Sequence, residues 1–319
     1  MNGKIKILVV QIGKLGDMIL MTPLFVELKS LYPDSEISVL ASPKNSVISK
    51  NLSVVDNTYE YSKKLLPTIR LINTLRNKSF DLWIDPKDEY SSTSKLLKSF
   101  CKPKKSIGFN FDKIVFDVNL NDYKTGEHRV DINLTPINYL CKEKIFRIVR
   151  PLIEIPEQDK INIKQRLEKV MGNKLLINVS AGIESREWST ENWINVTKNI
   201  KSGVNVILAG QEKDHERIKS IIDESKRDKM YFVGTKTIFE FAELIKDCDL
   251  LVTPDTSAVH LASCFNTPIV CLYNSVEWNR KKFSPLSDKQ VILISKEDNS
   301  INSIMPEAVL KAISFISVL

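Results

Sequence analysis

The sequence predicts an α/β protein made of two successive domains, each with a parallel sheet covered by helices. Short apolar runs rich in β-branched residues alternate with helical stretches, which is the rhythm of βα units on a parallel sheet. After an extended, proline-marked segment at residues 150–156, a fresh set of such units begins at Lys174. The chain has 319 residues, enough for two domains of ordinary size. We therefore expect domains at residues 1–150 and 151–319, and leave open whether the closing helix, residues 305–319, packs back.

The composition is that of a globular protein of the cytoplasm. Hydrophobic residues make up 43% of the chain, and mean hydropathy is -0.13. No run reaches the roughly 18 apolar residues that a membrane helix needs. The apolar run at residues 5–10 is predicted to be a core strand, because charged residues and a proline soon interrupt the apolar character of the chain after it. The five cysteines form no C-x-x-C pair, and their odd number argues against a disulfide framework and for a reducing cytoplasm.

The positive charge lies in the first half of the chain. Residues 1–150 hold 24 Lys and Arg against 16 Asp and Glu, whereas residues 151–319 hold 22 against 23. A basic half is typical of proteins with an anionic partner, such as phosphorylated lipid, a membrane surface or nucleic acid. A solvated lysine-rich surface explains the same charge equally well.

A glycine-containing turn follows the first predicted strand, Lys4 to Gln11. Gly13 and Gly16 indicate a tight backbone before a helix expected from Met18 to Leu31. Their G-x-x-G spacing lacks the dinucleotide fingerprint, and no Lys-Ser or Lys-Thr follows as in a Walker loop. Asp17 lies in the first helical turn, where a carboxylate most often caps the helix.

Further strands and helices are predicted along the chain. In the first domain we expect strands near residues 36–41, 81–84 and 106–109 and helices near residues 65–76 and 133–141. His128, which precedes the last of these, is predicted to be structural. In the second domain we expect a helix at residues 159–171, strands at 174–179, 204–209 and 231–234, and helices at 213–225 and 237–248. Ser189 is expected to open another helix.

The stretch from Leu250 to Asn274 carries the clearest signal. It is predicted to form a strand, a turn, a helix and a second strand, with prolines at the edges. Asp255, Thr256 and Ser257 fall where the helix begins, so their oxygens suit a helix cap. The free N–H groups and dipole of the same helix end suit a phosphate. His260 lies on the first turns of this helix, near the strand ends at which α/β sheets bind ligands.

These motifs resemble those of the ADP-heptose:lipopolysaccharide heptosyltransferases, glycosyltransferase family nine. The matching letters are P-D-T-S-A-V-H-L-A at residues 254–262, T-P-I-V-C-L-Y at 267–273, and Gly16-Asp17 followed by Thr22-Pro23. That family usually has Asp-Thr-Gly where this chain has Asp255-Thr256-Ser257. It usually has serines at the positions of Gly13 and Lys14. It usually has a lysine two positions before a matching tryptophan, where this chain has Arg186.

The resemblance implies a GT-B fold, in which two Rossmann-like domains face a central cleft. Residues 1–150 would bind the acceptor and residues 151–319 the nucleotide sugar. The implied reaction is inverting transfer of a heptose, from ADP-heptose, to a lipopolysaccharide or lipooligosaccharide core. Asp17 would be the general base, and Arg186 would neutralise charge on the departing diphosphate. An exposed ion pair of Arg186 with Glu184 or Glu187 is the alternative.

The same resemblance implies the binding residues and partners. Nucleotide-sugar binding is expected at Ser180, Gly182, Arg186, Glu212, Asp255, Thr256, Ser257 and His260. Acceptor binding is expected at Gly13 and Lys14. The partners would be a nucleotide-sugar donor and an anionic glycolipid acceptor, with no nucleic acid and with peripheral contact at the inner face of the cytoplasmic membrane. No metal or other cofactor is expected, because three scattered histidines give no ligand set.

Other classes stay open. A related GT-B enzyme could use another nucleotide sugar, either as a glycosyltransferase or as an epimerase, although an epimerase gives the basic first half no purpose. A non-catalytic relative that binds nucleotide or lipid is a third hypothesis. A nicotinamide oxidoreductase ranks low, because the glycine fingerprint is missing.

Overall fold

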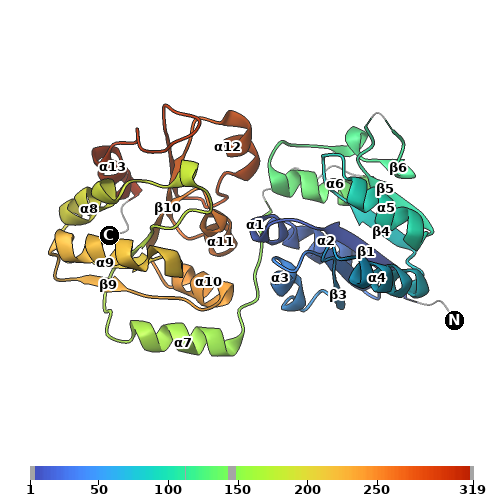
Figure 1. Ribbon diagram of the computed structural model, residues 1–319, viewed down its shortest axis with the longest axis horizontal. Coiled ribbons are helices and arrows are strands. Elements are labelled where there is room, and N and C mark those ends of the chain that lie inside the picture. Colours follow the sequence, from blue (N-terminus) through green and yellow to red (C-terminus); the bar gives the residue numbers. More distant parts are fainter. Residues whose placement is uncertain (1–3, 112, 143–148, 317–319) are drawn as a thin grey trace. The chain divides into compact units, whose positions relative to one another are not determined.

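The computed structural model describes residues 4–111, 113–142 and 149–316. The chain separates into two compact units, Met1–Glu154 and Ile155–Leu319, and each is described by itself (Figure 1). Both units are α/β, with one six-stranded parallel sheet each. The predicted fold class, two α/β units with parallel sheets, is therefore confirmed.

Unit 1 contains a doubly wound sheet with strand order β3-β2-β1-β4-β5-β6. The strands are β1 (Lys6–Gln11), β2 (Glu36–Ala41), β3 (Asn57–Glu60), β4 (Leu82–Asp85), β5 (Lys105–Gly108) and β6 (Val118–Asn119). β1 pairs with both β2 and β4, so the direction of strand succession reverses between β1 and β4. Ligands of open α/β sheets bind beyond the carboxyl ends of the strands at such a switch point.

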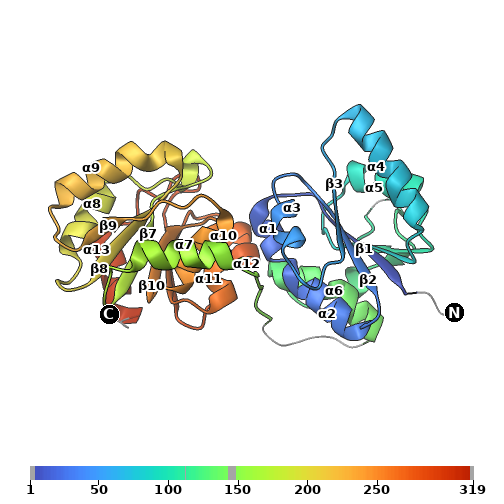
Figure 2. The ribbon, with the colours of Figure 1, turned by 90° about the horizontal axis from the view of Figure 1, so that it is seen from below.

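Helices cover both faces of this sheet. They are α1 (Leu15–Ile19), α2 (Thr22–Leu31), α3 (Ser46–Lys50), α4 (Leu65–Lys78), α5 (Ser92–Cys101) and α6 (Arg129–Cys141), with a short 3-10 helix at Asn121–Tyr123. Figure 2 shows α4 and α5 together on one side of the sheet and α2 and α6 on the other. Leu71 and Leu75 of α4 and Leu97 of α5 pack in one cluster with alternate strand residues such as Leu8 and Val10 of β1. That alternation is the period of two that a strand imposes.

The helix predicted from Met18 to Leu31 is two helices, so that expectation was wrong. α1 ends at Ile19, and α2 begins at Thr22. Pro23 lies in the first turn of α2, where its missing N–H costs nothing. The Thr22 hydroxyl donates to the Ile19 carbonyl at 2.8 Å and so satisfies a free carbonyl of the broken helix.

Unit 2 repeats the same winding with strand order β12-β11-β10-β7-β8-β9. The strands are β7 (Lys174–Asn178), β8 (Asn205–Ala209), β9 (Met230–Phe232), β10 (Leu250–Pro254), β11 (Ile269–Tyr273) and β12 (Gln290–Ile294). β7 and β10 pair directly, with Leu175 opposite Leu250 and Ile177 opposite Val252. The switch point of unit 2 therefore lies between β7 and β10.

The helices of unit 2 are α7 (Glu157–Leu167), α8 (Thr190–Asn199), α9 (His215–Ser225), α10 (Ile238–Lys246), α11 (Ser257–Phe265), α12 (Glu277–Phe283) and α13 (Pro306–Ile316), with 3-10 turns at Glu184–Arg186 and Glu212–Asp214. α13 packs on α8, β11 and β12, so the closing helix belongs to unit 2. Trp188 and Trp193 meet edge to face in the core, with ring centroids 4.6 Å apart. In the described part of the chain, none of the helices is long and apolar enough to cross a membrane.

Candidate functional site

Two loops flank the switch point of unit 2. The loop after β7 carries Ser180, Gly182 and Arg186, and the turn after β10 carries Asp255 and Thr256. Because β7 and β10 are parallel neighbours, both loops leave the same edge of the sheet. β8 is the other neighbour of β7, and Glu212 follows it. The predicted residues of this unit therefore come from three adjacent strand ends.

Thr256 is the N-cap of α11, as predicted. Its hydroxyl accepts a hydrogen bond from the Ala258 N–H at 3.2 Å. The Asn178 amide donates to the hydroxyls of Thr253 at 2.9 Å and Thr256 at 3.4 Å, so the last residue of β7 is tied to the turn after β10. Ser257 is the first helical residue. This turn presents the positive end of the α11 dipole at the switch point.

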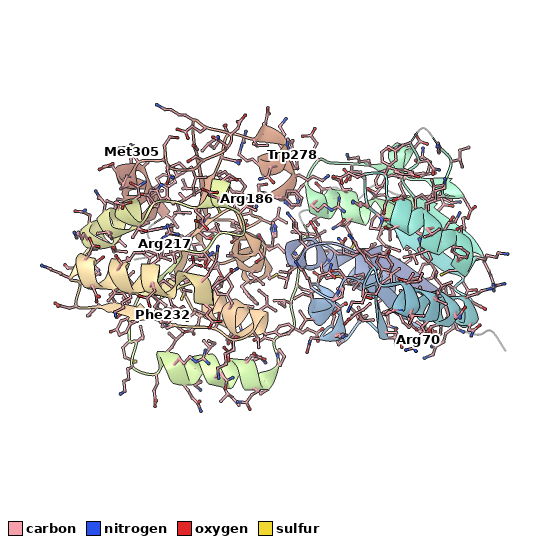
Figure 3. All side chains as sticks on the ribbon, in the orientation of Figure 1. Arg70, Arg186, Arg217, Phe232, Trp278 and Met305 are labelled. Atoms are coloured by element: carbon pink, nitrogen blue, oxygen red, sulfur yellow. The ribbon has the colours of Figure 1, made fainter. Side chains whose placement is uncertain are left out.

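Arg186 pairs with Asp255 rather than with its neighbours in sequence. Its Nη2 lies 3.0 Å from Asp255 Oδ2, and its Nη1 donates to the Asp255 carbonyl at 2.9 Å. Glu187 instead pairs with Lys213 at 3.1 Å. Among the described residues no ion pair joins Arg186 to Glu184 or Glu187, so that alternative was wrong. The guanidinium thus joins the two loops of the switch point; Arg186 is labelled in Figure 3.

Asn279 of α12 completes this arrangement. Its amide donates to Asp255 Oδ2 at 2.6 Å, and its oxygen accepts from Arg186 Nη2 at 3.3 Å. The Asp255 side chain is only 5% exposed, whereas that of Arg186 is 25% exposed. A buried carboxylate therefore holds a partly exposed cation in place, which orients the guanidinium without a loss of side-chain entropy on binding.

His260 lies inside the unit, at 6% exposure. Its ring packs against Phe283 of α12, with centroids 6.1 Å apart, and its carbonyl accepts from the Cys264 thiol. The structure therefore places His260 behind the turn at residues 255–257, as a residue that joins α11 to α12.

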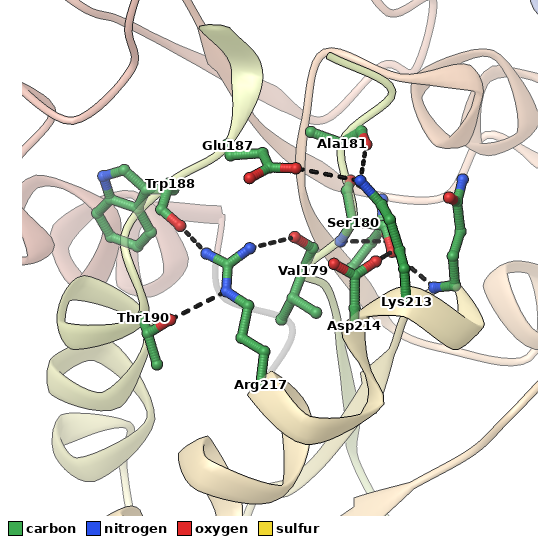
Figure 4. A network of polar contacts seen from close by, with 11 residues as sticks. Val179, Ser180, Ala181, Glu187, Trp188, Thr190, Lys213, Asp214 and Arg217 are labelled. Carbon is green, nitrogen blue, oxygen red and sulfur yellow. Dashed lines mark hydrogen bonds and ion pairs between the residues drawn. The ribbon is translucent and has the colours of Figure 1, made fainter. Parts of the chain in front are cut away.

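A polar network fixes the loop after β7 (Figure 4). Ser180, 6% exposed, donates its hydroxyl proton to Asp214 and accepts from the Gln211 N–H at 2.7 Å. Its donor and one of its two acceptor positions are thus used inside the protein. Gly182, in contrast, has open space where a side chain would begin, and Glu212 is exposed. Gly182 and Glu212 are therefore accessible at the sheet edge, whereas the buried Ser180 holds the loop through its hydrogen bonds.

Arg217 and Lys213 bind both ends of the same loop. Arg217 donates to the carbonyls of Val179 and Trp188 and, at 3.1 Å, to the hydroxyl of Thr190. Lys213 donates to the Ala181 carbonyl at 3.2 Å. These contacts reach both ends of the loop that carries Arg186 (Figure 4). The backbone around Arg186 is therefore held by side chains from the start of α9 and the turn before it.

The switch point of unit 1 carries Gly13, Lys14 and Asp17. Asp17 Oδ2 accepts from the Lys14 N–H at 3.1 Å, so this carboxylate caps α1. A Cβ at Gly13 would lie 3.0 Å from the same oxygen, so glycine allows the close approach. Asp17 is half-buried and Lys14 is exposed. No hydrogen bond to Asp17 Oδ1 is found within the described ranges, so one carboxylate oxygen remains available.

The β2–α3 turn supports this loop. The Ser42 hydroxyl donates to the Gly13 carbonyl at 2.8 Å, and the Asn45 amide donates to the Gln11 carbonyl at 2.9 Å. Beside it, at the end of β4, burial raises the pKa of the Asp85 carboxyl above its ordinary value. The unit 1 site thus joins a supported backbone to one partly exposed carboxylate.

Several supporting residues were not predicted from the sequence. Asn178 ends an apolar predicted strand, and Asp214 lies at the start of a predicted helix, so a polar residue at each place is a usable signal. Asn279, Arg217, Ser42 and Asn45 lie in no recognisable motif, and only the folded chain brings them to the loops. Across the residues that the structure describes, no group of three or more His, Cys, Asp or Glu could hold a metal ion.

Two six-stranded parallel sheets, each wound in the same order with polar loops at its switch point, define a GT-B type fold. Comparison with known proteins agrees. The family glycosyltransferase family 9 (heptosyltransferase) matches residues 68–312. A lipooligosaccharide heptosyltransferase 2 of Haemophilus influenzae is 24% identical over 90% of this chain and 88% of its own length.

Solved structures share the fold. The glycosyl transferase family 9 protein of Veillonella parvula has a TM-score of 0.82 at 18% identity, covering 98% of this chain and 97% of its own. The ADP-heptose lipopolysaccharide heptosyltransferase II of E. coli has a TM-score of 0.75 at 22% identity, with 98% of both chains covered. The chain belongs to glycosyltransferase family 9, and it is a glycosyltransferase.

Proposed function

We propose that this protein transfers a heptose from ADP-heptose to a lipopolysaccharide or lipooligosaccharide core, with inversion at the anomeric carbon. The family and the full-length likeness to lipooligosaccharide heptosyltransferase 2 support the sugar and the acceptor class. The E. coli relative named for ADP-heptose supports the donor. The observation that carries the proposal is the Arg186–Asp255 pair beside the N-terminus of α11.

Unit 2 is proposed to bind the donor. A diphosphate can bind to the Arg186 guanidinium and to the free N–H groups at the N-terminus of α11, which both lie at the switch point of unit 2. Arg186 and the α11 end at Thr256 and Ser257 would stabilise the charge that develops on the leaving diphosphate. Asp255 would orient Arg186, and His260 would hold α11 from inside the unit.

The loop residues after β7 and β8 are proposed to contact the nucleoside. Gly182 leaves room for a ligand beside the backbone. Glu212 is exposed, and a carboxylate suits paired ribose hydroxyls because it only accepts hydrogen bonds. Ser180 supports the loop from which these contacts are made.

Unit 1 is proposed to bind the acceptor and to supply the base. Asp17 would accept the proton of the acceptor hydroxyl through Oδ1 while Oδ2 stays on the Lys14 N–H. Gly13 and Lys14 would face the acceptor, and the lysine charge suits an anionic glycolipid. The anionic leaving group is met by Arg186 and backbone N–H groups, and we propose that no metal takes part.

The test is transfer and binding with a panel of donors. The purified protein is titrated with ADP, UDP, GDP, CMP and dTDP, and the melting temperature is followed, since a ligand of the folded state raises it. Transfer is then measured by mass spectrometry with ADP-heptose and a heptose-free core acceptor. We expect a selective shift with ADP and a product heavier by one heptose. A selective shift with UDP or dTDP would remove ADP-heptose, and a flat panel with no product would favour the non-catalytic alternative.

A further inference from the structure

Helices α4 and α5 of unit 1 expose apolar and basic side chains together. The exposed residues of the two helices and their flanks, here called the basic–apolar face, are Leu65, Leu66, Ile69, Leu96 and Phe100 with Lys63, Lys64, Arg70, Arg76, Lys95 and Lys102. α4 and α5 pack against each other and lie together on one side of the sheet (Figure 2). Arg70, an exposed residue of α4, is labelled in Figure 3.

The apolar exposure on this face is large. Leu65 is 75% exposed and Leu66 68% exposed, and Ile69 and Phe100 are each about half exposed. α4 buries Leu71 and Leu75 on the sheet, which leaves its Leu66 and Ile69 on the opposite side of the helix. Single exposed apolar residues need no explanation, but a patch of several on two adjacent helices marks an interaction surface.

The charge on this face is of one sign. Residues 62–80 and 90–105 hold ten Lys and Arg and no Asp or Glu. The rest of residues 1–150 holds 14 basic and 16 acidic residues, so the positive excess of the first half comes entirely from these two segments. Within the described chain, the six basic side chains of the face form no hydrogen bond or ion pair, whereas Lys104 pairs with Asp81. Their charge is therefore uncompensated.

We propose that the basic–apolar face docks unit 1 on an anionic phospholipid bilayer. Aliphatic and aromatic side chains enter the headgroup region while flanking lysines and arginines meet lipid phosphates, which is the pattern of a membrane-surface helix. A second copy of the face is disfavoured because the two positive surfaces repel. A nucleic acid gives the exposed leucines no apolar partner.

The docking also fits the position of the unit 1 site. α4 follows β3 and α5 follows β4, so both helices begin at the carboxyl edge of the sheet, from which the Asp17 loop also leaves. Bound through this face, unit 1 has that edge near the lipid surface in which a glycolipid acceptor lies. The link between docking and access to the acceptor rests on the proposed function. The binding to lipid itself is measured without acceptor or donor.

The experiment is co-sedimentation of the full chain with vesicles of phosphatidylcholine alone or with 30% phosphatidylglycerol. One variant carries Arg70→Gln, Arg76→Gln, Lys95→Gln and Lys102→Gln, and its control carries Lys164→Gln, Lys169→Gln, Lys198→Gln and Lys201→Gln, all exposed in unit 2. A second variant carries Leu65→Gln, Leu66→Gln and Ile69→Gln, and its control carries Ile161→Gln, Met171→Gln and Phe315→Gln, also exposed. Circular dichroism checks that every variant is folded.

We expect binding to anionic vesicles that weakens with salt and is weak on neutral ones. Each basic side chain near such a surface contributes about a fivefold change in partitioning, so the four-charge variant should bind about 100-fold or more weakly. The apolar variant should bind about tenfold or more weakly. Both controls should stay within about threefold of the wild type, since their charges and apolar groups lie outside the face.

Three results would overturn the proposal. They are no binding to anionic vesicles, equal losses in the variants and their controls, and a dimer in light scattering that the apolar variant dissociates. Transfer to a water-soluble core acceptor is measured in parallel. If transfer persists while vesicle binding is absent, the docking proposal fails and the proposed function stands.

Discussion

The ion pair between Arg186 and Asp255 gives a sharp energetic prediction. Arg186→Ala leaves a carboxylate that is 5% exposed, with the Asn279 amide still donating to it at 2.6 Å. Removing one partner of a buried pair costs about 3–5 kcal/mol. Arg186 itself is 25% exposed, so solvent partly screens its charge. We therefore expect Arg186→Ala to lower the free energy of unfolding by about 3 kcal/mol, the low end of this range. For a domain of this size that lowers the melting temperature by about 6–12 °C.

The same pair predicts a large coupling energy. In an Asp255→Asn background the buried charge is already gone, so Arg186→Ala should cost only about 1 kcal/mol, the value of ordinary hydrogen bonds. The coupling in the double-mutant cycle is then about 2 kcal/mol. Fluorescence-detected thermal and urea unfolding measures it, since Trp188 and Trp193 are buried in the same unit.

A matched control comes from Arg70. This arginine is exposed and unpaired within the described residues, so Arg70→Ala should change stability by less than about 0.5 kcal/mol. If Arg186→Ala costs the same in the wild type and in the Asp255→Asn background, the pair carries no energy and the account of the site is wrong.

Three further predictions concern other parts of the chain. Arg217→Ala should lower kcat/KM for the donor about tenfold or more, because the loop that carries Gly182 and Arg186 loses its bonds to Trp188 and Thr190; an unchanged kcat/KM would contradict this. Burial opposes ionisation of Glu240, but hydrogen bonds from the Lys236 N–H, Asn162 and Arg166 outweigh it and lower the pKa of Glu240. Its stabilisation is therefore present above the unfolded carboxyl pKa and lost as pH falls through the folded value, so Glu240→Gln should cost about 1–3 kcal/mol at pH 7 and less at pH 3 in urea unfolding. In native protein a disulfide reagent at pH 8 should modify one thiol fast, the exposed Cys141, because burial raises the pKa of Cys101 to about 11 and those of Cys248, Cys264 and Cys271 as well; fast reaction of several thiols would contradict the packing.

Much of the fold was predictable because the central strands are buried on both faces. Their centres, residues 175–177 and 250–252, are continuous apolar runs, and such runs are read directly from sequence. Three of the four edge strands were missed for the opposite reason, whereas β9 was predicted. β3 and β6 are two to four residues long and only partly buried, and β12 is half exposed, so none of them has a distinctive pattern.

The site was predictable only in part. Thr256 as a helix cap and Asp17 in a first turn follow from local rules, and the structure has both. The pairing of Arg186 with Asp255 did not follow, since 69 residues separate them and only the adjacency of β7 and β10 brings them together. Nearer charges in sequence, Glu184 and Glu187, were the natural partners to expect.

The proposed reaction depends most directly on Asp17 as its general base, and Asp17→Asn tests that role. An asparagine oxygen can still accept from the Lys14 N–H, so the cap of α1 is kept while the base is lost. The measurement is kcat for heptose transfer together with the dissociation constant of ADP, with Asp34→Asn, an exposed carboxylate of the same unit, as the control. We predict a fall in kcat of about 100-fold or more, an ADP affinity within about twofold of the wild type, and an unchanged control. Retained turnover, or equal losses in turnover and ADP affinity, would contradict the central claim that Asp17 is the general base of a glycosyl transfer.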